Sequence, residues 1–137
     1  IYIMKRLALI SFALVSMLAF AACSSPTKKA ERVTMDFVNA LNASDYDKAR
    51  SYTASEQAKA YVGLVEYFDS EKSDDSEEAK AARAKITSRI TRTEQQQDTV
   101  ICYVETIEAT DKPDTINQKV LLTKVDNEWK VVEVPMK

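Results

Sequence analysis

The chain has 137 residues and a formal net charge of −2, and it contains no histidine and a single glycine, Gly63. This length suits one small folded domain, and a mildly acidic balance without a basic cluster argues against a nucleic acid partner. Without histidine the chain lacks the usual general base near neutral pH, the commonest zinc ligand and every nucleophile–histidine pair. The lone glycine excludes a glycine-rich phosphate-binding loop. We therefore expect neither a metal nor a cofactor.

The N-terminal stretch has the pattern of an export signal. Lys5 and Arg6 precede an apolar run from Leu7 to Ala22 that only two serines interrupt. A basic start, an apolar core of about 7–15 residues and small residues before a cleavage point are typical of a secretory signal peptide. The run is shorter than the roughly 20 residues that a membrane span needs. We expect residues 1–22 to be a signal peptide.

The cysteine after this run is the predicted site of lipidation. The stretch 20–23 (Phe-Ala-Ala-Cys) resembles the bacterial lipobox, in which the cysteine becomes the lipidated first residue of the mature chain, although Phe20 replaces the usual aliphatic residue. The resemblance implies that residues 23–29 tether the chain to a lipid bilayer of the bacterial cell envelope through acylated Cys23. Ser24 and the absence of an acidic cluster after the cysteine favour the outer membrane, facing the periplasm. The alternative is an ordinary secretion signal that happens to contain a cysteine.

Two helices are predicted after the tether. Apolar residues recur at steps of three and four over residues 27–42, which predicts an amphipathic helix with one buried face. A second, shorter helix is predicted over residues 45–52. We expect it to begin at Ser44, because a serine followed three positions later by an acidic residue, here Asp47, resembles the capping pattern of a helix N-terminus.

A third helix is predicted from Thr53, where Glu56 repeats the same start signal, to about Phe68. Gly63 lies inside this helix, where glycine costs about 1 kcal/mol relative to alanine. We therefore expect close packing at that position to require it. The acidic stretch 70–78 lacks the ligand spacing of a calcium loop, so we expect a solvated linker there.

The C-terminal part carries the alternating and β-branched patterns of strands. We expect Cys102 to be a buried free thiol, because it lies in an apolar run and an unpaired cysteine behaves as a small hydrophobe. In the last strand we expect Trp129 and Val131 on one face and Val134 on the other. Helices followed by strands indicate an α+β fold, with the N-terminal helices packed on an antiparallel sheet of about four strands. Turn residues separate the predicted strands, which cover residues 86–92, 99–108, 115–125 and 128–134.

Two segments resemble small bacterial lipoproteins of the nuclear transport factor 2-like, or cystatin-like, superfamily. Residues 31–49 (ERVTMDFVNALNASDYDKA) are similar to the opening of these proteins, where a helix ending in Phe-Val-x-Ala-Leu precedes x-x-Asp-Tyr-x-Lys-Ala. Residues 127–131 (NEWKV) are similar to their final hairpin, usually Asp-Gly-x-Trp-Lys, but lack its turn glycine. The resemblance implies a single domain over residues 30–137, in which a curved sheet wraps a long helix as a cone, often with a cavity at the open end. No catalytic set of the superfamily matches this chain position by position, so we expect no catalytic residues.

Our main functional hypothesis is a membrane-anchored envelope lipoprotein with a non-catalytic domain that binds a small molecule or an envelope protein. Tyrosines are the candidate contact residues, since a phenol offers both an apolar ring and a polar tip. Ordinary packing, with the hydroxyl reaching water, is the competing interpretation for each of them. The candidates are Tyr46, Tyr61, Tyr67 and Tyr103.

Two other functions stay open from the sequence. One is an isomerase- or dehydratase-like enzyme, in which an Asp–Tyr pair moves a proton next to a carbonyl after burial has raised the pKa of the carboxylate. Asp45 and Asp98 are the candidate acids. The other is a structural or assembly role as an accessory subunit, with a homodimer formed through the open sheet face. A buried carboxylate opposite a tyrosine would favour the enzyme, and a wide apolar sheet face would favour assembly.

Overall fold

The computed structural model describes residues 26–71, 77–78, 85–109 and 114–136. The predicted signal peptide, the predicted lipidation site Cys23 and most of the tether lie outside these residues, as does much of the acidic linker. Within the described ranges, no helix combines the length and the apolar character that crossing a membrane would need.

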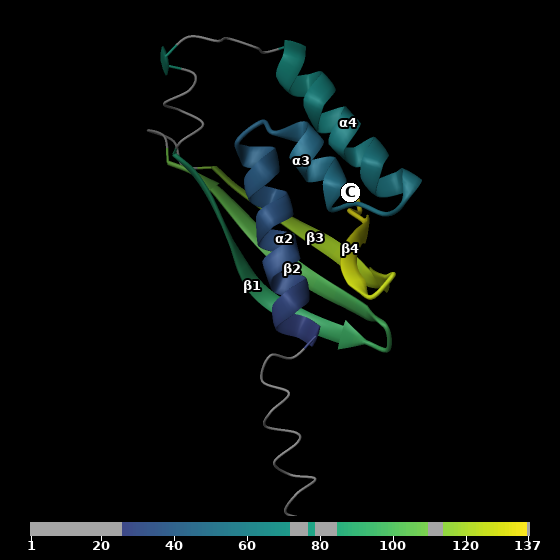
Figure 1. Cartoon of the computed structure of the whole chain (residues 1–137). Coiled ribbons are helices and arrows are strands. Elements are labelled where there is room, and N and C mark those ends of the chain that lie inside the picture. Colours follow the sequence, from purple (N-terminus) through teal and green to yellow (C-terminus); the bar gives the residue numbers. More distant parts are fainter. Residues whose placement is uncertain (1–25, 72–76, 79–84, 110–113, 137) are drawn as a thin grey trace, which may run out of the picture.

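Three helices and one four-stranded sheet make up the fold, and Figure 1 shows the helices on one side of the sheet. The helices and strands follow one another without interleaving, which is the predicted α+β order, and the sheet is an antiparallel meander in the order β1-β2-β3-β4. The helices are α2 (Pro26–Asn42), α3 (Tyr46–Ser51) and α4 (Glu56–Glu71), and the strands are β1 (Ile86–Gln96), β2 (Thr99–Glu108), β3 (Asp114–Val125) and β4 (Glu128–Glu133).

Helix α2 lies along β1 and runs antiparallel to it. Near its start, the Thr93 hydroxyl donates a hydrogen bond to Glu31 Oε1 at 2.8 Å. At its end, Asn42 Nδ2 donates to Ser88 Oγ, also at 2.8 Å. The two contacts place the start of α2 beside the end of β1, and the end of α2 beside the start of β1.

The core lies between α2, α4 and the inner face of the sheet. Alternate residues of β2 are buried against the helices, among them Val100, Cys102 and Val104, as the predicted strand pattern requires. Cys102 is a buried free thiol, which confirms the prediction, and burial raises its pKa. Trp129 is 7% exposed, and its Nε1 has no hydrogen-bond acceptor among the described residues.

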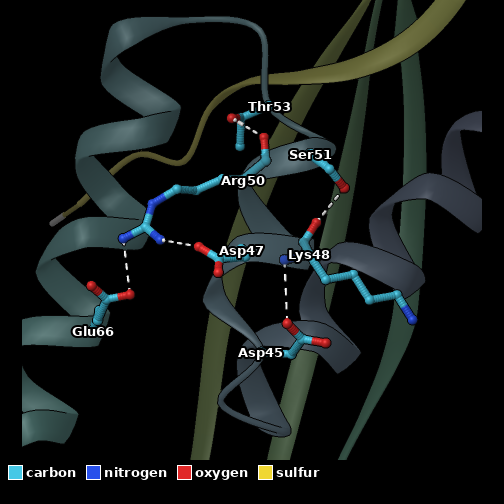
Figure 2. A network of polar contacts seen from close by, with 7 residues as sticks. All are labelled: Asp45, Asp47, Lys48, Arg50, Ser51, Thr53 and Glu66. Atoms are coloured by element: carbon cyan, nitrogen blue, oxygen red, sulfur yellow. Dashed lines mark hydrogen bonds and ion pairs between the residues drawn. The ribbon is translucent and has the colours of Figure 1, made fainter.

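Helix α3 begins one residue later than predicted. Ser44 has a φ of 59°, in the left-handed region, and it follows the end of α2. Asp45 is the N-cap instead, because its carboxylate accepts a hydrogen bond from the Lys48 amide at 3.3 Å (Figure 2). The prediction that Ser44 caps the helix was therefore wrong.

Helix α4 also has a different cap from the one predicted. The Ser55 hydroxyl accepts a hydrogen bond from the Ala58 amide at 3.1 Å, so Ser55 caps the helix. Thr53 instead donates its hydroxyl to the Arg50 carbonyl at 2.7 Å and forms a parallel bridge with Val131 of β4. The segment before α4 thus belongs partly to the edge of the sheet.

An ion-pair network fixes α3 against α4. The two terminal nitrogens of Arg50 reach Asp47 Oδ1 at 3.1 Å and Glu66 Oε2 at 2.9 Å, as Figure 2 shows. The Asp47 pair is an i,i+3 contact on the surface of α3, and such exposed pairs contribute little stability. The Glu66 contact joins two helices, so it orients α3 relative to α4.

Gly63 does not mark a close approach between elements. A Cβ atom built at this position meets no other atom within 4 Å. The expectation of close packing at Gly63 was therefore wrong, and the glycine imposes its helix-propensity cost without a steric reason that the structure shows.

The last strand contains a bulge that changes the predicted facing of its side chains. The pairing with β3 passes from Val131 to Glu133 and skips Val132. An extra residue in one strand shifts the alternation by one position. Val134 is therefore buried in the same core as Trp129 and Val131, and its predicted placement on the opposite face was wrong.

Candidate functional site

Polar side chains without formal charge gather between the helices and the sheet, at the end of the domain where α2 ends. They come from α2, from α4 and from three neighbouring strands, so segments distant in the sequence supply them. We call this group the distal polar cluster. Its members are Asn42, Tyr61, Ser88, Thr106 and Gln118.

The first part of the cluster is a hydrogen-bonded chain of three residues. Ser88 and Thr106 lie directly opposite each other in the β1–β2 ladder, and their hydroxyl oxygens are 2.6 Å apart. Ser88 also accepts the hydrogen bond from the Asn42 amide. Thr106 is 8% exposed. The end of α2 is therefore joined to two strands through neutral donors and acceptors.

The second part of the cluster joins α4 to β3. Gln118 Nε2 donates a hydrogen bond to the Tyr61 hydroxyl oxygen. Gln118 is opposite Val104 in the ladder, two residues before Thr106 on the same face of β2. Diagonal neighbours of this kind are about 7–8 Å apart between Cα atoms. The two parts therefore share one end of the inner sheet face.

The cluster is electrically neutral near neutral pH. Burial raises the pKa of Tyr61 above its usual value, while the hydrogen bond from Gln118 acts in the opposite direction. The phenol therefore stays protonated. Among the described residues, no side chain accepts the Tyr61 hydroxyl proton or donates to Gln118 Oε1. The cluster thus keeps one donor and one acceptor for an uncharged polar group.

Exposed apolar side chains flank the cluster. Leu64 and Phe68 follow Tyr61 at helical spacings of three and seven residues, and Ile116 precedes Gln118 by two residues on the same strand face. Phe68 and Ile116 are 53% and 49% exposed, and Leu64 is also exposed. Large apolar side chains left in water beside convergent polar groups are a common feature of binding surfaces.

The structure places three of the predicted contact tyrosines on the helical side of the sheet, in different settings. Tyr61 is part of the cluster. Tyr46 begins α3 and donates its hydroxyl to the exposed Asp69 near the end of α4. The pKa of Tyr46 is raised, mainly by burial and to a smaller extent by the Asp69 carboxylate. Tyr67 is 57% exposed and contacts the Phe68 ring edge-on, with centroids 5.8 Å apart.

Tyr103 lies on the opposite, outer face of the sheet. Its ring is 4.0 Å from the Arg92 guanidinium carbon and 5.6 Å from the Lys119 ammonium, and its hydroxyl donates to Glu94 at 3.3 Å. The four tyrosines therefore do not surround one site, and among them only Tyr61 belongs to the distal polar cluster.

The candidate acids of the enzyme hypothesis lie at the surface. Asp45 is exposed and serves as the cap of α3. Asp98 is exposed in the β1–β2 turn, at the opposite end of the sheet from Ser88 and Thr106. The described ranges also contain no group of three or more acidic or cysteine side chains placed to hold a metal ion.

The sequence singled out only Tyr61 among the five cluster members. Ser88 and Thr106 occupy ordinary alternating positions of their strands, and for Asn42 the sequence predicts only the end of a helix. Their convergence depends on the ladder register and on the direction of α2, neither of which a local pattern contains. A polar residue at a core-facing position, such as Gln118, is the one signal that could have pointed to the cluster.

The architecture is the nuclear transport factor 2-like (NTF2-like) α+β fold: helices on one face of an open antiparallel sheet. One solved structure that matches it is described as an NTF2-like transpeptidase from Campylobacter jejuni, with 20% identity and a TM-score of 0.50 over 74% of this chain and 95% of that chain. A second is an NTF2-like protein of unknown function from Shewanella oneidensis, with 11% identity and a TM-score of 0.58 over 80% and 96%.

A third match is a Bdellovibrio bacteriovorus structure, with 11% identity and a TM-score of 0.52 over 76% of this chain and 37% of that chain. No protein-family model matches the chain, and neither does any curated protein. At these identities the similarity establishes the fold alone, because one fold hosts many unrelated functions. Function must therefore be argued from the distal polar cluster.

Proposed function

We propose that the chain is a lipid-anchored binding protein of the bacterial envelope, held in the membrane by acylated Cys23. The domain binds a small uncharged ligand at the distal polar cluster. The observation that carries the proposal is the convergence of neutral donors and acceptors beside exposed apolar side chains. Such a site suits a ligand with an apolar body and an uncharged hydrogen-bonding group.

The position of the cluster suits an anchored protein. Cys23 is three residues before Pro26 in the sequence, so the anchor belongs at the start of α2. The 17 residues of α2 span about 25 Å at about 1.5 Å per residue. The cluster at the far end of α2 is then held away from the bilayer surface, where a ligand from the periplasm reaches it.

Binding rather than catalysis accounts for the chemistry of the cluster. Four of its members do not titrate, and the raised pKa of Tyr61 keeps its proton in place near neutral pH. The Campylobacter structure is described as a transpeptidase, but the thiol of Cys102 here is buried and has a raised pKa. A thiol in that state is a poor nucleophile, so we do not assign acyl transfer to it.

An assembly role is the second candidate, and the outer sheet face favours it because no described helix covers that face (Figure 1). Four of the charges on that face pair within the chain: Arg89 pairs with Glu105 at 3.0 Å, and Arg92 with Glu94 at 3.1 Å. A homodimer through this face predicts that Leu121→Glu, at a half-buried outer position, lowers the mass measured by sedimentation equilibrium.

The anchor is tested by growth with radioactive palmitate. We expect the wild-type chain to carry label and Cys23→Ser to carry none, because lipidation needs the thiol. A Cys23→Ser chain that is still labelled, or a wild-type chain that is not, would contradict the anchor.

The ligand is tested by capture. The purified full chain is incubated with an envelope extract, and small molecules that stay bound are released and identified by mass spectrometry. Gln118→Ala should lose the captured compound, while Asn117→Ala, an exposed neighbour on the opposite face of β3, should keep it. Equal recovery from both variants would contradict a site at the cluster.

A further inference from the structure

The two edges of the sheet differ in how far other segments of the chain hydrogen-bond to their backbone. Along β4, the Val131 amide donates to the Tyr52 carbonyl at 2.8 Å, and the Ala54 amide donates to the Val131 carbonyl at 2.9 Å. The Gln57 side chain also covers this edge. Its Nε2 donates to the Val134 carbonyl and its Oε1 accepts from the Val134 amide, both at 3.1 Å. The edge-facing backbone groups of Val131 and Val134 are therefore satisfied.

The other edge, along β1, is open over the described part of the chain. β1 spans Ile86–Gln96 and pairs only with β2 among the described strands. Its ladder is regular over residues 86–90 and is interrupted by a bulge at Thr91. Unpaired edge amides and carbonyls are a template for another extended chain, and bulges and charged side chains limit self-association. The regular part of β1 thus remains available as a template.

A shallow, open groove of about 500 Å³ lies between this part of β1 and α2. Its apolar lining is Met35 from α2 and Ile90 from β1. Side chains of an added strand that point toward the helices would lie against these two residues, because alternate side chains of a strand point to opposite faces.

The charges of the groove are mainly positive. Lys28 and Arg32 line it from α2 and Arg89 from β1. The side chains of Lys28 and Arg32 have no ion-pair partner within the described ranges. The single acid of the lining, Glu31, accepts a hydrogen bond from Thr93. Two cations therefore remain available to an incoming carboxylate.

We infer that a partner protein docks an acidic, extended peptide segment in this groove, as a fifth strand on the regular part of β1. Main-chain hydrogen bonds to the edge supply affinity in this mode, and alternate side chains supply specificity. A second copy of the chain fits poorly, because its β1 edge would bring a second set of the unpaired cations Lys28 and Arg32 to this groove. The inference goes beyond the proposed function and does not depend on the Cys23 anchor. It shares Ser88 with the distal polar cluster, because this residue also lines the groove.

The test uses the full chain in neutral detergent micelles and a short capped peptide of alternating Glu and Val. Amide hydrogen exchange and chemical shifts of residues 86–90 are measured with and without peptide. We expect the edge amides to exchange rapidly in the free chain and to become protected on binding. The corresponding Lys–Val peptide should not bind, and a Glu–Val peptide N-methylated on its edge-facing side should lose binding.

The double variant Lys28→Glu/Arg32→Glu should weaken binding of the Glu–Val peptide roughly tenfold or more at low salt. Its matched control, Lys48→Glu/Lys59→Glu, reverses two exposed cations on α3 and α4 and should leave binding unchanged. Slow exchange of the edge amides in the free chain, equal binding of the two peptides, or no effect of the charge reversal would overturn the inference. Anionic phospholipid vesicles that occupy the groove cations without protecting residues 86–90 would overturn it as well.

Discussion

The hydroxyl pair of the distal polar cluster allows a quantitative prediction about the free energy of unfolding. Ser88 and Thr106 face each other with oxygens 2.6 Å apart, and Ser88 also accepts from Asn42. Thr106→Val keeps the shape of the side chain but removes one hydrogen bond, while Ser88 keeps its bond to Asn42. We expect a loss of about 1 kcal/mol in the free energy of unfolding.

Ser88→Ala is expected to cost more. It leaves the Thr106 hydroxyl, on a residue only 8% exposed, without its partner, and an unsatisfied buried polar group costs about 1–3 kcal/mol. The double variant removes both hydroxyls, and replacing both partners by apolar groups can be nearly neutral. Only Asn42 then loses its acceptor, and its side chain is half-buried rather than buried. The cost of the double variant should therefore be about 1 kcal/mol or less, well below the sum of the two single variants.

Urea denaturation followed by circular dichroism measures the three variants against the wild type. Thr115→Val, at an exposed position of β3, is the matched control and should change stability by less than about 0.5 kcal/mol. The cycle should give a coupling energy of about 1–2 kcal/mol. Additive single-variant effects would refute the reasoning, because they would mean that the two hydroxyls do not interact in the folded protein.

Three further predictions concern the helices and the pH dependence of stability. Gly63→Ala should stabilise the fold by up to about 1 kcal/mol, since the added Cβ meets no atom within 4 Å. Ala60→Gly, at an exposed position of the same helix, is the control and should destabilise the fold by a similar amount. A Gly63→Ala variant with a lower urea midpoint than the wild type would contradict the structure at this position. Asp45→Ala should cost about 1 kcal/mol through loss of the α3 cap, whereas Ser44→Ala should leave that cap intact, and thermal unfolding compares the two. Because burial raises the pKa of Tyr61, the folded state holds that proton more tightly than the unfolded state. The resulting stability is complete below about pH 10 and is lost as the pH rises through the folded pKa. Tyr61→Phe should therefore flatten the alkaline fall in the free energy of unfolding, and an unchanged slope would contradict the raised pKa.

The sequence predicted most elements of this fold well because they carry long local patterns. The first strand is an exception, since it was predicted over residues 86–92 and β1 spans Ile86–Gln96. The predicted helix 27–42 and the strand 99–108 correspond to α2 and β2 within one residue. Asp126 and Asn127 form the tight turn between the last two predicted strands, and both have positive φ, as a hairpin turn without glycine requires.

Neighbouring residues of similar chemistry explain the errors in helix starts. Ser44 and Asp45 are both good N-caps, as are Thr53 and Ser55. The outcome depends on backbone conformation and on tertiary contacts: Ser44 takes a left-handed φ of 59°, and Thr53 bridges to β4. Capping preferences alone do not choose between such neighbours.

The candidate site was harder to predict than the fold. Tyr46, Tyr67 and Tyr103 were chosen for their chemistry, but the side of the sheet and the exposure of each depend on tertiary structure. Val134 shows the same limit, since a bulge at Val132 reverses the expected facing after it. The distal polar cluster forms only when the ladder register sets Thr106 opposite Ser88.

The proposal of a neutral ligand at the distal polar cluster is tested most directly by affinity. The compound captured by the wild-type chain is titrated, by calorimetry, into the wild type and into the Tyr61→Phe/Gln118→Ala variant, which lacks the donor and the acceptor that the cluster leaves free. Loss of one or two neutral hydrogen bonds to the ligand should raise the dissociation constant by about 10-fold or more. An unchanged dissociation constant in a folded double variant would contradict the assignment of the site.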